Sequence, residues 1–292
     1  MMPVFIVGCG DIGQRVAALW RARGAEVHGL ARSEEAGKRL AAKGIAVVAG
    51  DLEQPASLND LPTAGRIVYY FAPPPVTGDS DPLMKNFLQV IADSALPKTI
   101  VLISTTAVYG DCHGEWIDET RPVNPQTARG RRRLDAEQQL RKWCEPRQVG
   151  FVILRVGGIY GPGRLPVARL RQGLPILNLE QSPYTNRIHQ DDLARICVAA
   201  AERGTSGAIY NVSDGQPGTM SQYFIDVAAA LQLPAPRQVD MAEAKQVMSA
   251  GMLSYLQESR RLDNEKMLDD LRIELQYPNL AAGLAGLKKA AE

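Results

Sequence analysis

The stretch that decides the fold is VFIVGCGDIGQRVAALW, residues 4–20. It opens with a continuous apolar run at 4–7, which is typical of a strand buried in a parallel sheet. Apolar residues later in the stretch recur at helical spacing. Between the two patterns lie Gly8, Gly10 and Gly13, spaced G-x-G-x-x-G. That spacing alone is weak, but its position between a strand and a helix predicts a dinucleotide-binding turn.

Each glycine has a separate physical task in such a turn. Gly8 allows the sharp reversal, Gly10 lets the backbone approach a pyrophosphate, and Gly13 lets the helix pack closely on the strand. Asp11 and Ile12 begin the helix whose N-terminus would face the anion, so they are also predicted cofactor-binding residues. An ordinary glycine-rich turn is the alternative interpretation.

The strand and helix patterns continue to alternate after this turn. This alternation predicts an α/β fold, a doubly wound parallel Rossmann sheet with a smaller C-terminal α+β substrate lobe. We expect a dinucleotide-binding domain over 1–160, to which 186–212 returns, and the substrate lobe over 161–292. The predicted strands are 4–7, 25–31, 45–50, 66–72, 99–104, 150–156 and 208–212, and the main later helices are 126–146, 191–204, 219–232, 241–258 and 264–271.

Composition excludes several classes of protein. The 292 residues are 45% apolar and 22% charged with a formal net charge of +1, so no overall field favours nucleic acid or a membrane surface. The four cysteines show no C-x-x-C spacing, and no His, Cys and carboxylate cluster has metal-ligand spacing, so we predict no metal. No apolar run approaches the ~20 residues that span a bilayer, and the N-terminus does not resemble a signal peptide. We expect a cytoplasmic protein.

The residues after the early strands favour one form of the cofactor. An acid at the end of the second strand would accept a hydrogen bond from the ribose of NAD, but Arg32 stands there. A guanidinium can pair with the 2′-phosphate of NADP, so we predict NADP over NAD. Asp51 and Leu52 follow the third strand, where Asp51 could accept from the adenine or cap a turn. Phe71, Ala72 and Pro73, at the end of the fourth strand, are predicted to line the same site.

Several stretches together match one family pattern: VGCGDIG (7–13), GDLEQPASL (50–58), ISTTAVYGD (103–111), NPQTARGRRRLDAE (124–137), LRVGGIYGPG (154–163), RIHQDDLA (187–194) and IYNVSDG (209–215). In order and spacing they resemble the extended short-chain dehydrogenase/reductases, the NAD-dependent epimerase/dehydratase family. The resemblance implies a Ser or Thr after the fifth strand and a Tyr-x-x-x-Lys pair on the next helix. Thr105 matches the Ser/Thr position, and Ser104 beside it would contact the cofactor.

The helix departs from that pattern. Gly130 and Glu137 fix its register, which puts Arg129 at the Tyr position and Arg133 at the Lys position. Four residues apart, the two arginines share one helix face, which the resemblance directs toward the cofactor, and Arg131 and Arg132 are expected to point to solvent. A guanidinium stays protonated at neutral pH and cannot shuttle a proton, but it can hold an anion or stabilise an oxyanion.

Two hypotheses follow from this departure. The first is an NAD(P)-dependent enzyme of atypical mechanism acting on a small anionic or nucleotide-linked substrate, with Thr105, Arg129 and Arg133 at its catalytic positions. The second is a catalytically silent dinucleotide-binding sensor or regulatory protein. The minor candidates for a replacement proton donor are Tyr109, Asp111, Cys112, His113 and Tyr160, each of which could instead be structural or face solvent. The resemblance also suggests a homodimer through helices near 83–95 and 127–146.

Overall fold

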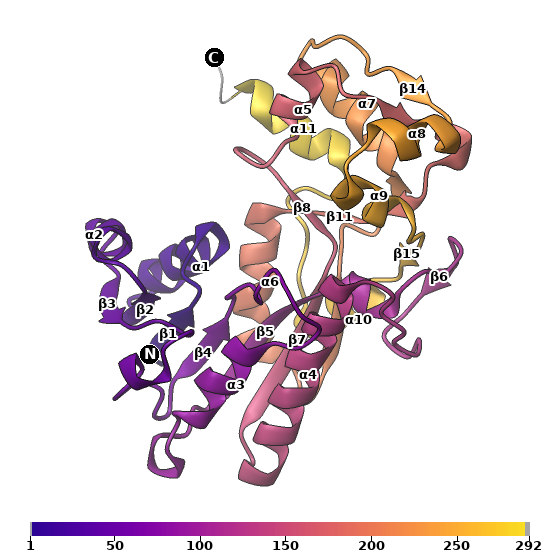
Figure 1. Ribbon diagram of the computed structural model, residues 1–292. Coiled ribbons are helices and arrows are strands. Elements are labelled where there is room, and N and C mark those ends of the chain that lie inside the picture. The colour runs from indigo at the N-terminus through magenta and orange to yellow at the C-terminus, as the bar shows by residue number, and fades with distance from the viewer. Residues whose placement is uncertain (1, 290–292) are drawn as a thin grey trace.

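A seven-stranded parallel sheet forms the centre of the structure, a computed structural model that describes residues 2–289 (Figure 1). Every neighbouring pair of strands runs parallel, as the alternating sequence pattern predicts. In spatial order the strands are β3 (Ala46–Ala49), β2 (Val27–Ala31), β1 (Val4–Val7), β4 (Ile67–Tyr70), β5 (Thr99–Thr105), β7 (Gly150–Val156) and β12 (Ile209–Val212). The extreme ends of the two predicted domains, residue 1 and residues 290–292, lie outside the described residues.

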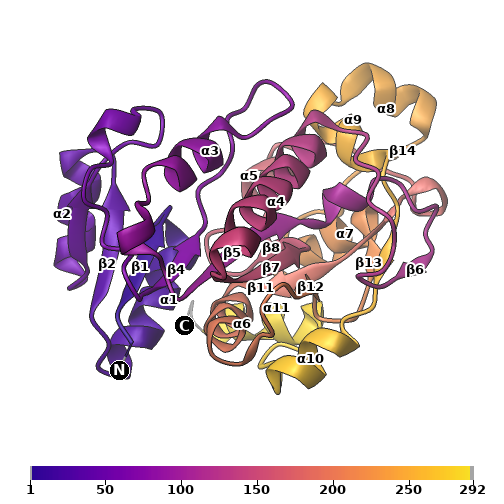
Figure 2. The ribbon, with the colours of Figure 1, turned by 90° about the horizontal axis from the view of Figure 1, so that it is seen from below.

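Helices cover both faces of this sheet (Figure 2). One face packs against α1 (Asp11–Ala22), α2 (Glu34–Ala42), α6 (Gln190–Arg203) and α10 (Glu265–Leu271). The other face packs against α3 (Pro82–Gln89) and α4 (Ala128–Arg147). Because β1, β4, β5 and β7 are buried on both sides, their sequences are almost continuously apolar. The doubly wound α/β class predicted from the sequence is therefore confirmed.

The strand order also says where a ligand would bind. From β1 the chain moves outward to β2 and β3, and then crosses back to place β4 on the other side of β1. At such a reversal the connections leave β1 and β4 in opposite directions, which opens a crevice at the carboxyl ends of these strands. The glycine turn follows β1 at this point.

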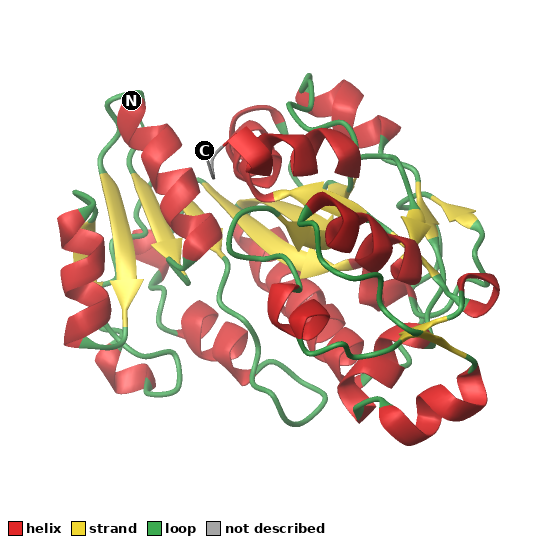
Figure 3. Ribbon diagram, turned by 90° about the horizontal axis from the view of Figure 1, so that it is seen from above, coloured by secondary structure: helices red, strands yellow, loops and turns green. Residues whose placement is uncertain are grey.

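The later part of the chain builds a smaller helical lobe at the carboxyl ends of β5 and β7, mostly orange and yellow in Figure 1. Seen from above, helices and loops lie in front of part of the sheet (Figure 3). The lobe contains its own apolar core, which includes Phe224 and Val227. Its helices are α5 (Val167–Arg171), α7 (Met220–Ala230), α8 (Met241–Val247), α9 (Ala250–Leu256) and α11 (Leu280–Lys289). Short strand pairs complete it: β8 (Gly158–Tyr160) with β11 (Arg187–His189), β9 (Ile176–Leu177) with β14 (Gln238–Val239), and β10 (Tyr184–Thr185) with β13 (Gly218–Thr219).

The chain passes between the sheet and this lobe more than once. After β11, α6 and β12 return to the sheet, and α10 packs against both of them. Another return pairs β15 (Arg261–Leu262) with β6 (Trp116–Ile117), a strand in the segment after β5.

The prediction of one helix over 241–258 was wrong. The helix stops after Val247 because Met248 takes an extended conformation, with φ −97° and ψ 149°. Ser249 then starts α9, since its hydroxyl accepts a hydrogen bond from the backbone N–H of Met252 at 3.3 Å. A serine in this position is a strong N-cap, and it makes a second helix start where the apolar periodicity alone suggested continuation.

All four cysteines are buried and unpaired. Cys9 and Cys197 lie in the core on the α1 and α6 face, and Cys144 lies on the buried side of α4. Cys112 lies in a small cluster beside β6. Burial raises the pKa of Cys9 and of Cys144 to about 12, and it also raises the pKa of Cys112 and Cys197. Among residues 2–289, no helix is long and apolar enough to cross a membrane.

Candidate functional site

The glycine turn has the shape that a bound pyrophosphate requires. Gly8 adopts a φ of 85°, and a Cβ there would lie 2.3 Å from the backbone nitrogen of Ala72, so no larger residue fits. A Cβ on Gly13 would come within 3.1 Å of the Gly8 oxygen, which shows how closely α1 packs on β1. A Cβ on Gly10 would meet nothing within 4 Å. The open backbone at Gly10 is where the phosphates of a dinucleotide would approach.

A first cavity, of about 600 Å³, extends from this turn along the ends of the early strands. It holds six of the predicted cofactor residues: Gly8, Arg32, Asp51, Leu52, Ala72 and Pro73. The prolines and apolar side chains of the loop after β4 form one wall, so the cavity offers an apolar slot with polar groups at its rim. Ile12 is buried beneath the turn, and Phe71 packs against the core rather than lining this cavity.

The two charged residues predicted to bind the cofactor in the first cavity, Asp51 and Arg32, have different surroundings. Asp51 accepts a hydrogen bond from the Glu53 N–H at 3.0 Å through Oδ1, so the carboxylate already stabilises the turn after β3. Arg32 takes part in no ion pair or side-chain hydrogen bond with the described residues. Arg32 is an exposed residue that lines the cavity, so its donors are available to a ligand.

A second cavity, of about 340 Å³, lies at the carboxyl ends of β5 and β7, under the helical lobe. Thr105 and Arg129 both line it, so the structure brings these two predicted residues together. Three further arginines from the lobe side, Arg164, Arg187 and Arg260, line the same space. Among the cavity-lining side chains the only carboxylate is that of Glu258, so positive charge predominates.

Arg129 is held at one wall of the second cavity by α9 and the segment after it. Its Nη2 lies 3.7 Å from Oε2 of Glu258, and its guanidinium lies 3.9 Å from the ring centroid of Tyr255. The same Glu258 carboxylate, which is 4% exposed, forms a close ion pair with Arg260. Arg260 also donates from Nε to the Gly110 carbonyl at 3.0 Å. Arg260 thus donates to two acceptors, while Arg129 is held by an ion pair and by stacking on the Tyr255 ring.

Arg133 lies one helical turn further along α4 and faces a different neighbour. Its Nη1 donates to the Ala72 carbonyl at 3.2 Å, so it contacts the loop that forms a wall of the first cavity. Burial lowers the pKa of this guanidinium, and attraction to Asp81 opposes the effect. Thus Arg129 faces the second cavity, while Arg133 supports the edge of the first.

The prediction that Arg132 points to solvent was wrong. Arg132 is 8% exposed, and its Nη1 donates to the Gly78 carbonyl at 2.6 Å. Arg131 is more exposed and lies 3.0 Å from Asp79, in the same loop. Because the loop after β4 runs alongside the first turns of α4, three successive arginines fasten it at its start and at its tip.

Ser104 is used by the protein interior. Its hydroxyl donates to the carboxylate of Glu137, which in turn receives two hydrogen bonds from Arg155 at 2.8 and 3.2 Å. Glu137 and Arg155 are 4% exposed each, so this is a buried ion pair between α4 and β7. The Ser104 hydroxyl is therefore directed away from the cavities.

Neither of the two tyrosines among the minor candidates for proton transfer lines the second cavity. Tyr109 is 1% exposed and donates to Oδ1 of Asn211 at 2.8 Å, and burial raises its pKa to about 12. Tyr160 is also buried, and its hydroxyl donates to the Asn279 carbonyl at 3.1 Å. Both hydroxyls are structural in these positions. Two tyrosines that the sequence reasoning missed, Tyr184 and Tyr255, line the cavity instead.

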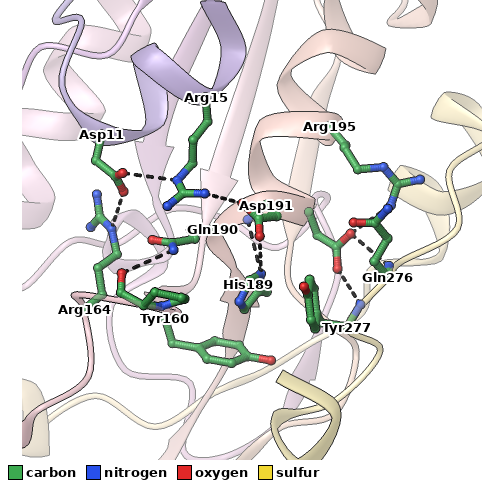
Figure 4. Close-up of polar contacts among 12 residues, drawn as sticks. Asp11, Arg15, Tyr160, Arg164, His189, Gln190, Asp191, Arg195, Gln276 and Tyr277 are labelled. Atoms are coloured by element: carbon green, nitrogen blue, oxygen red, sulfur yellow. Dashed lines mark hydrogen bonds and ion pairs between the residues drawn. The ribbon is translucent and has the colours of Figure 1, made fainter. Parts of the chain in front are cut away.

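An arginine bridges the glycine turn and the lobe (Figure 4). Arg164, from the loop after β8, lines the second cavity and donates from Nε to Asp11 Oδ2 at 2.9 Å. Arg15 binds the other oxygen of Asp11 at 3.1 Å and also contacts Asp191 at the start of α6. Although burial acts in the opposite direction, these guanidinium contacts keep the pKa of Asp11 below its usual value.

Comparison with known proteins agrees with this geometry. A family-wide sequence model described as the NAD dependent epimerase/dehydratase family matches residues 4–213. Protein YeeZ of Escherichia coli (strain K12) is 27% identical over 288 residues, which cover 96% of this chain and 97% of that protein. A solved structure of a functionally unknown conserved protein from Silicibacter pomeroyi DSS is 28% identical with a TM-score of 0.83, and each chain is covered completely.

The fold extends to better described enzymes. The structure of UDP-glucose 4-epimerase with UDP-glucose from Thermotoga maritima has a TM-score of 0.76 at 18% identity, again over 100% of both chains. Family members bind an NAD(P) nucleotide, and the glycine turn and the first cavity of this structure fit such a cofactor. With more than half of its length matched by the family model, this chain belongs to the NAD-dependent epimerase/dehydratase family.

Proposed function

We propose that this protein is an NADP-dependent oxidoreductase of the epimerase/dehydratase type, with an atypical mechanism and a small anionic or nucleotide-linked substrate. One observation carries the proposal: Thr105 and Arg129 meet three further arginines in a cavity beside the cofactor turn. A carboxylate or phosphate group is the natural ligand for such a set of guanidinium groups.

The cofactor would occupy the first cavity. The backbone at Gly10 and the N-terminus of α1 would hold the pyrophosphate, while Leu52 and Pro73 would enclose the adenosine. Arg32, which has no partner among residues 2–289, would pair with a 2′-phosphate, and this supports NADP over NAD. When bound, the cofactor supplies or accepts the hydride.

Proton transfer in this site needs a group other than the arginines. Tyr255 supports that role best, because it lines the same cavity as Thr105 and its ring stacks on Arg129. In the reducing direction, a substrate carbonyl carbon would accept hydride from the bound cofactor. The Tyr255 hydroxyl would donate its proton to the carbonyl oxygen and regain one from water, since this side chain is exposed. Thr105 would hydrogen-bond the substrate oxygen, and Arg129 would stabilise the negative charge that develops during proton transfer.

A catalytically silent dinucleotide-binding protein is the second candidate. It is favoured by the loss of both residues of the Tyr-x-x-x-Lys pair and by the structural use of Arg133, which binds the Ala72 carbonyl. In that case the first cavity would bind a nucleotide and the second would bind a regulatory anion, without reaction.

Cofactor titration followed by turnover assays tests both candidates. We expect NADPH to bind more tightly than NADH, and Arg32→Ala to remove most of that difference. Saturation at about 100 times the dissociation constant should add about 2.7 kcal/mol of stability. Lys38→Ala, on the exposed face of α2, is the control. Equal affinities would overturn the NADP preference, and binding without turnover of any sugar nucleotide or carbonyl acid would favour the silent protein. No binding of either dinucleotide would refute both.

Three further expectations stay predictions: a cytoplasmic location, no binding to nucleic acid or membranes, and a homodimer through α3 and α4. The outward side of α4 carries charged residues such as Arg141 and Lys142, so a dimer there would need complementary charges. Light scattering after gel filtration measures the assembly directly.

A further inference from the structure

Arg187 differs from the other arginines of the second cavity. Arg164 binds Asp11, while Arg129 and Arg260 share Glu258. The Arg187 side chain makes no ion pair and no hydrogen bond with any described residue, and its Nε is buried without a partner. Arg187 is half-buried, and leaving the N–H of its buried Nε without an acceptor costs free energy, as does withdrawing the charge from water without a partner.

The protein nevertheless holds this guanidinium in a fixed place. One face of it lies 4.0 Å from the ring centroid of Tyr223 on α7. Its Nη1 occupies the space where a side chain of Gly158 would begin, since a Cβ there would lie 2.1 Å from that nitrogen. Gly158 is the direct partner of Arg187 in the β8–β11 pair. The guanidinium is therefore held by Tyr223 on one face and lies close to the Gly158 backbone, while its Nη groups donate to no described residue and can serve a ligand in the cavity that Arg187 lines.

The neighbouring carboxyl does not neutralise this charge. Asp214 attracts Arg187, but no ion pair within 4.0 Å joins them. Asp214 is 6% exposed, its Oδ1 accepts from the Gln216 N–H at 3.0 Å, and its Oδ2 is buried without a partner. Burial raises the pKa of Asp214 to about 7, so much of this carboxyl is uncharged at neutral pH.

We propose that Arg187 is the anchor for the anionic group of the substrate, a compact oxyanion such as a carboxylate or a phosphate. The oxyanion would lie in the second cavity and accept hydrogen bonds from the Nη groups of the guanidinium, which Tyr223 and the neighbouring Gly158 backbone hold in place. This inference rests on the proposed function, because it names the substrate class of the same cavity. It assigns binding to Arg187 and leaves Arg129 for the reacting oxygen.

Anion titration of the full chain without cofactor tests the proposal. Sulfate serves as the tetrahedral probe and malonate as the carboxylate probe, both against sodium chloride at equal ionic strength. Binding is measured as the rise in melting temperature with anion concentration. Sulfate also stabilises proteins by exclusion from their surface, so the comparison is between variants. Arg187→Met removes the anchor, and Arg171→Met, at an exposed arginine of α5 outside the cavity, is the matched control.

We expect at least one probe to bind the wild type and the control saturably, and to bind Arg187→Met about tenfold more weakly or worse. Preference for sulfate would indicate a phosphate-bearing substrate, and preference for malonate a carboxylate. Without anion, Arg187→Met should melt at the same temperature as the wild type or higher, because an unpaired buried charge has been replaced by an apolar chain of similar length.

Two results would overturn the proposal: anion binding that is unchanged in Arg187→Met, or a large loss of stability in that variant without anion, which would make Arg187 structural. Both are independent of cofactor binding. If NADPH binds but the anion response does not depend on Arg187, the anchor is refuted while the proposed function stands. If the anion response depends on Arg187 but neither dinucleotide binds, the proposed function is refuted while Arg187 stands as an anion-binding residue.

Discussion

Asp214 should make the stability of the protein depend on pH in a direction opposite to that of most carboxyl groups. Its pKa rises from an ordinary 3.8 to about 7 on folding, chiefly because burial disfavours the charged form. The folded state therefore binds the proton more tightly than the unfolded chain does. The contribution of this group to stability is fully present below pH 3.8 and is lost as the pH rises through 7.

The expected magnitude follows from these two values. Each unit of pKa shift corresponds to about 1.36 kcal/mol, so the full rise is worth about 4 kcal/mol. Between pH 5 and pH 8.5, titration in both states accounts for about 2–3 kcal/mol of that amount. The replacement Asp214→Asn cannot ionise, but it keeps an oxygen able to accept from the Gln216 N–H. The wild type should therefore lose about 2–3 kcal/mol relative to this variant over that range.

Urea unfolding of both proteins at pH 5 and pH 8.5 measures the difference. Other titrating groups are common to both proteins and cancel in the comparison. Asp240→Asn, at the exposed N-cap of α8, is the control for the change from a carboxyl to an amide. Parallel pH profiles for the wild type and Asp214→Asn would refute the reasoning, because they would show that the carboxyl is ionised in the folded protein with an ordinary pKa.

Three further variants test other contacts. Arg155→Met should cost about 3–5 kcal/mol of stability by thermal unfolding, because it leaves the buried Glu137 carboxylate unpaired. The double variant Arg155→Met, Glu137→Leu should recover most of the loss, and no recovery would contradict the ion-pair interpretation. Asp11→Asn should tighten NADPH binding about two- to fivefold in calorimetry, because it removes a negative charge from the helix end that faces the pyrophosphate; weaker binding would count against that placement. Tyr255→Phe should reduce turnover about 100-fold or more while the dissociation constant of NADPH stays unchanged, and full activity in this variant would exclude the tyrosine as the proton carrier.

The sheet could be predicted from the sequence because its signals are local. A continuous apolar strand, a glycine turn and an amphipathic helix follow one another within residues 4–20, and the same rhythm recurs up to β7. A side chain at Gly8 or Gly13 would collide with neighbouring backbone wherever a strand, a glycine turn and a helix follow one another. The structure shows both close approaches. The break between α8 and α9 was missed because the cap at Ser249 competes with an apolar pattern that continues through it.

The second cavity could be predicted only in part, since its walls come from segments far apart in the sequence. Thr105 and Arg129 are placed there by the sheet and by α4, so the family pattern located them. Arg187 and Tyr255 enter from the lobe, whose orientation no local pattern specifies. The direction of Arg132 was mistaken because helix periodicity describes one helix in isolation, whereas the loop around Gly78 covers this face of α4.

The burial of every cysteine gives the folded protein a surface without thiols. A maleimide reagent added to the native protein should therefore react only as fast as the structure opens, because thiolates form readily only when the core is exposed to water. In the wild type, the cysteines on the two faces of the sheet therefore report, through their labelling rates, how often the core on each face opens. For the same reason, one cysteine introduced on the outer side of α9 would be the single labelling site on the folded protein, and a fluorophore there would report on the lobe beside the second cavity.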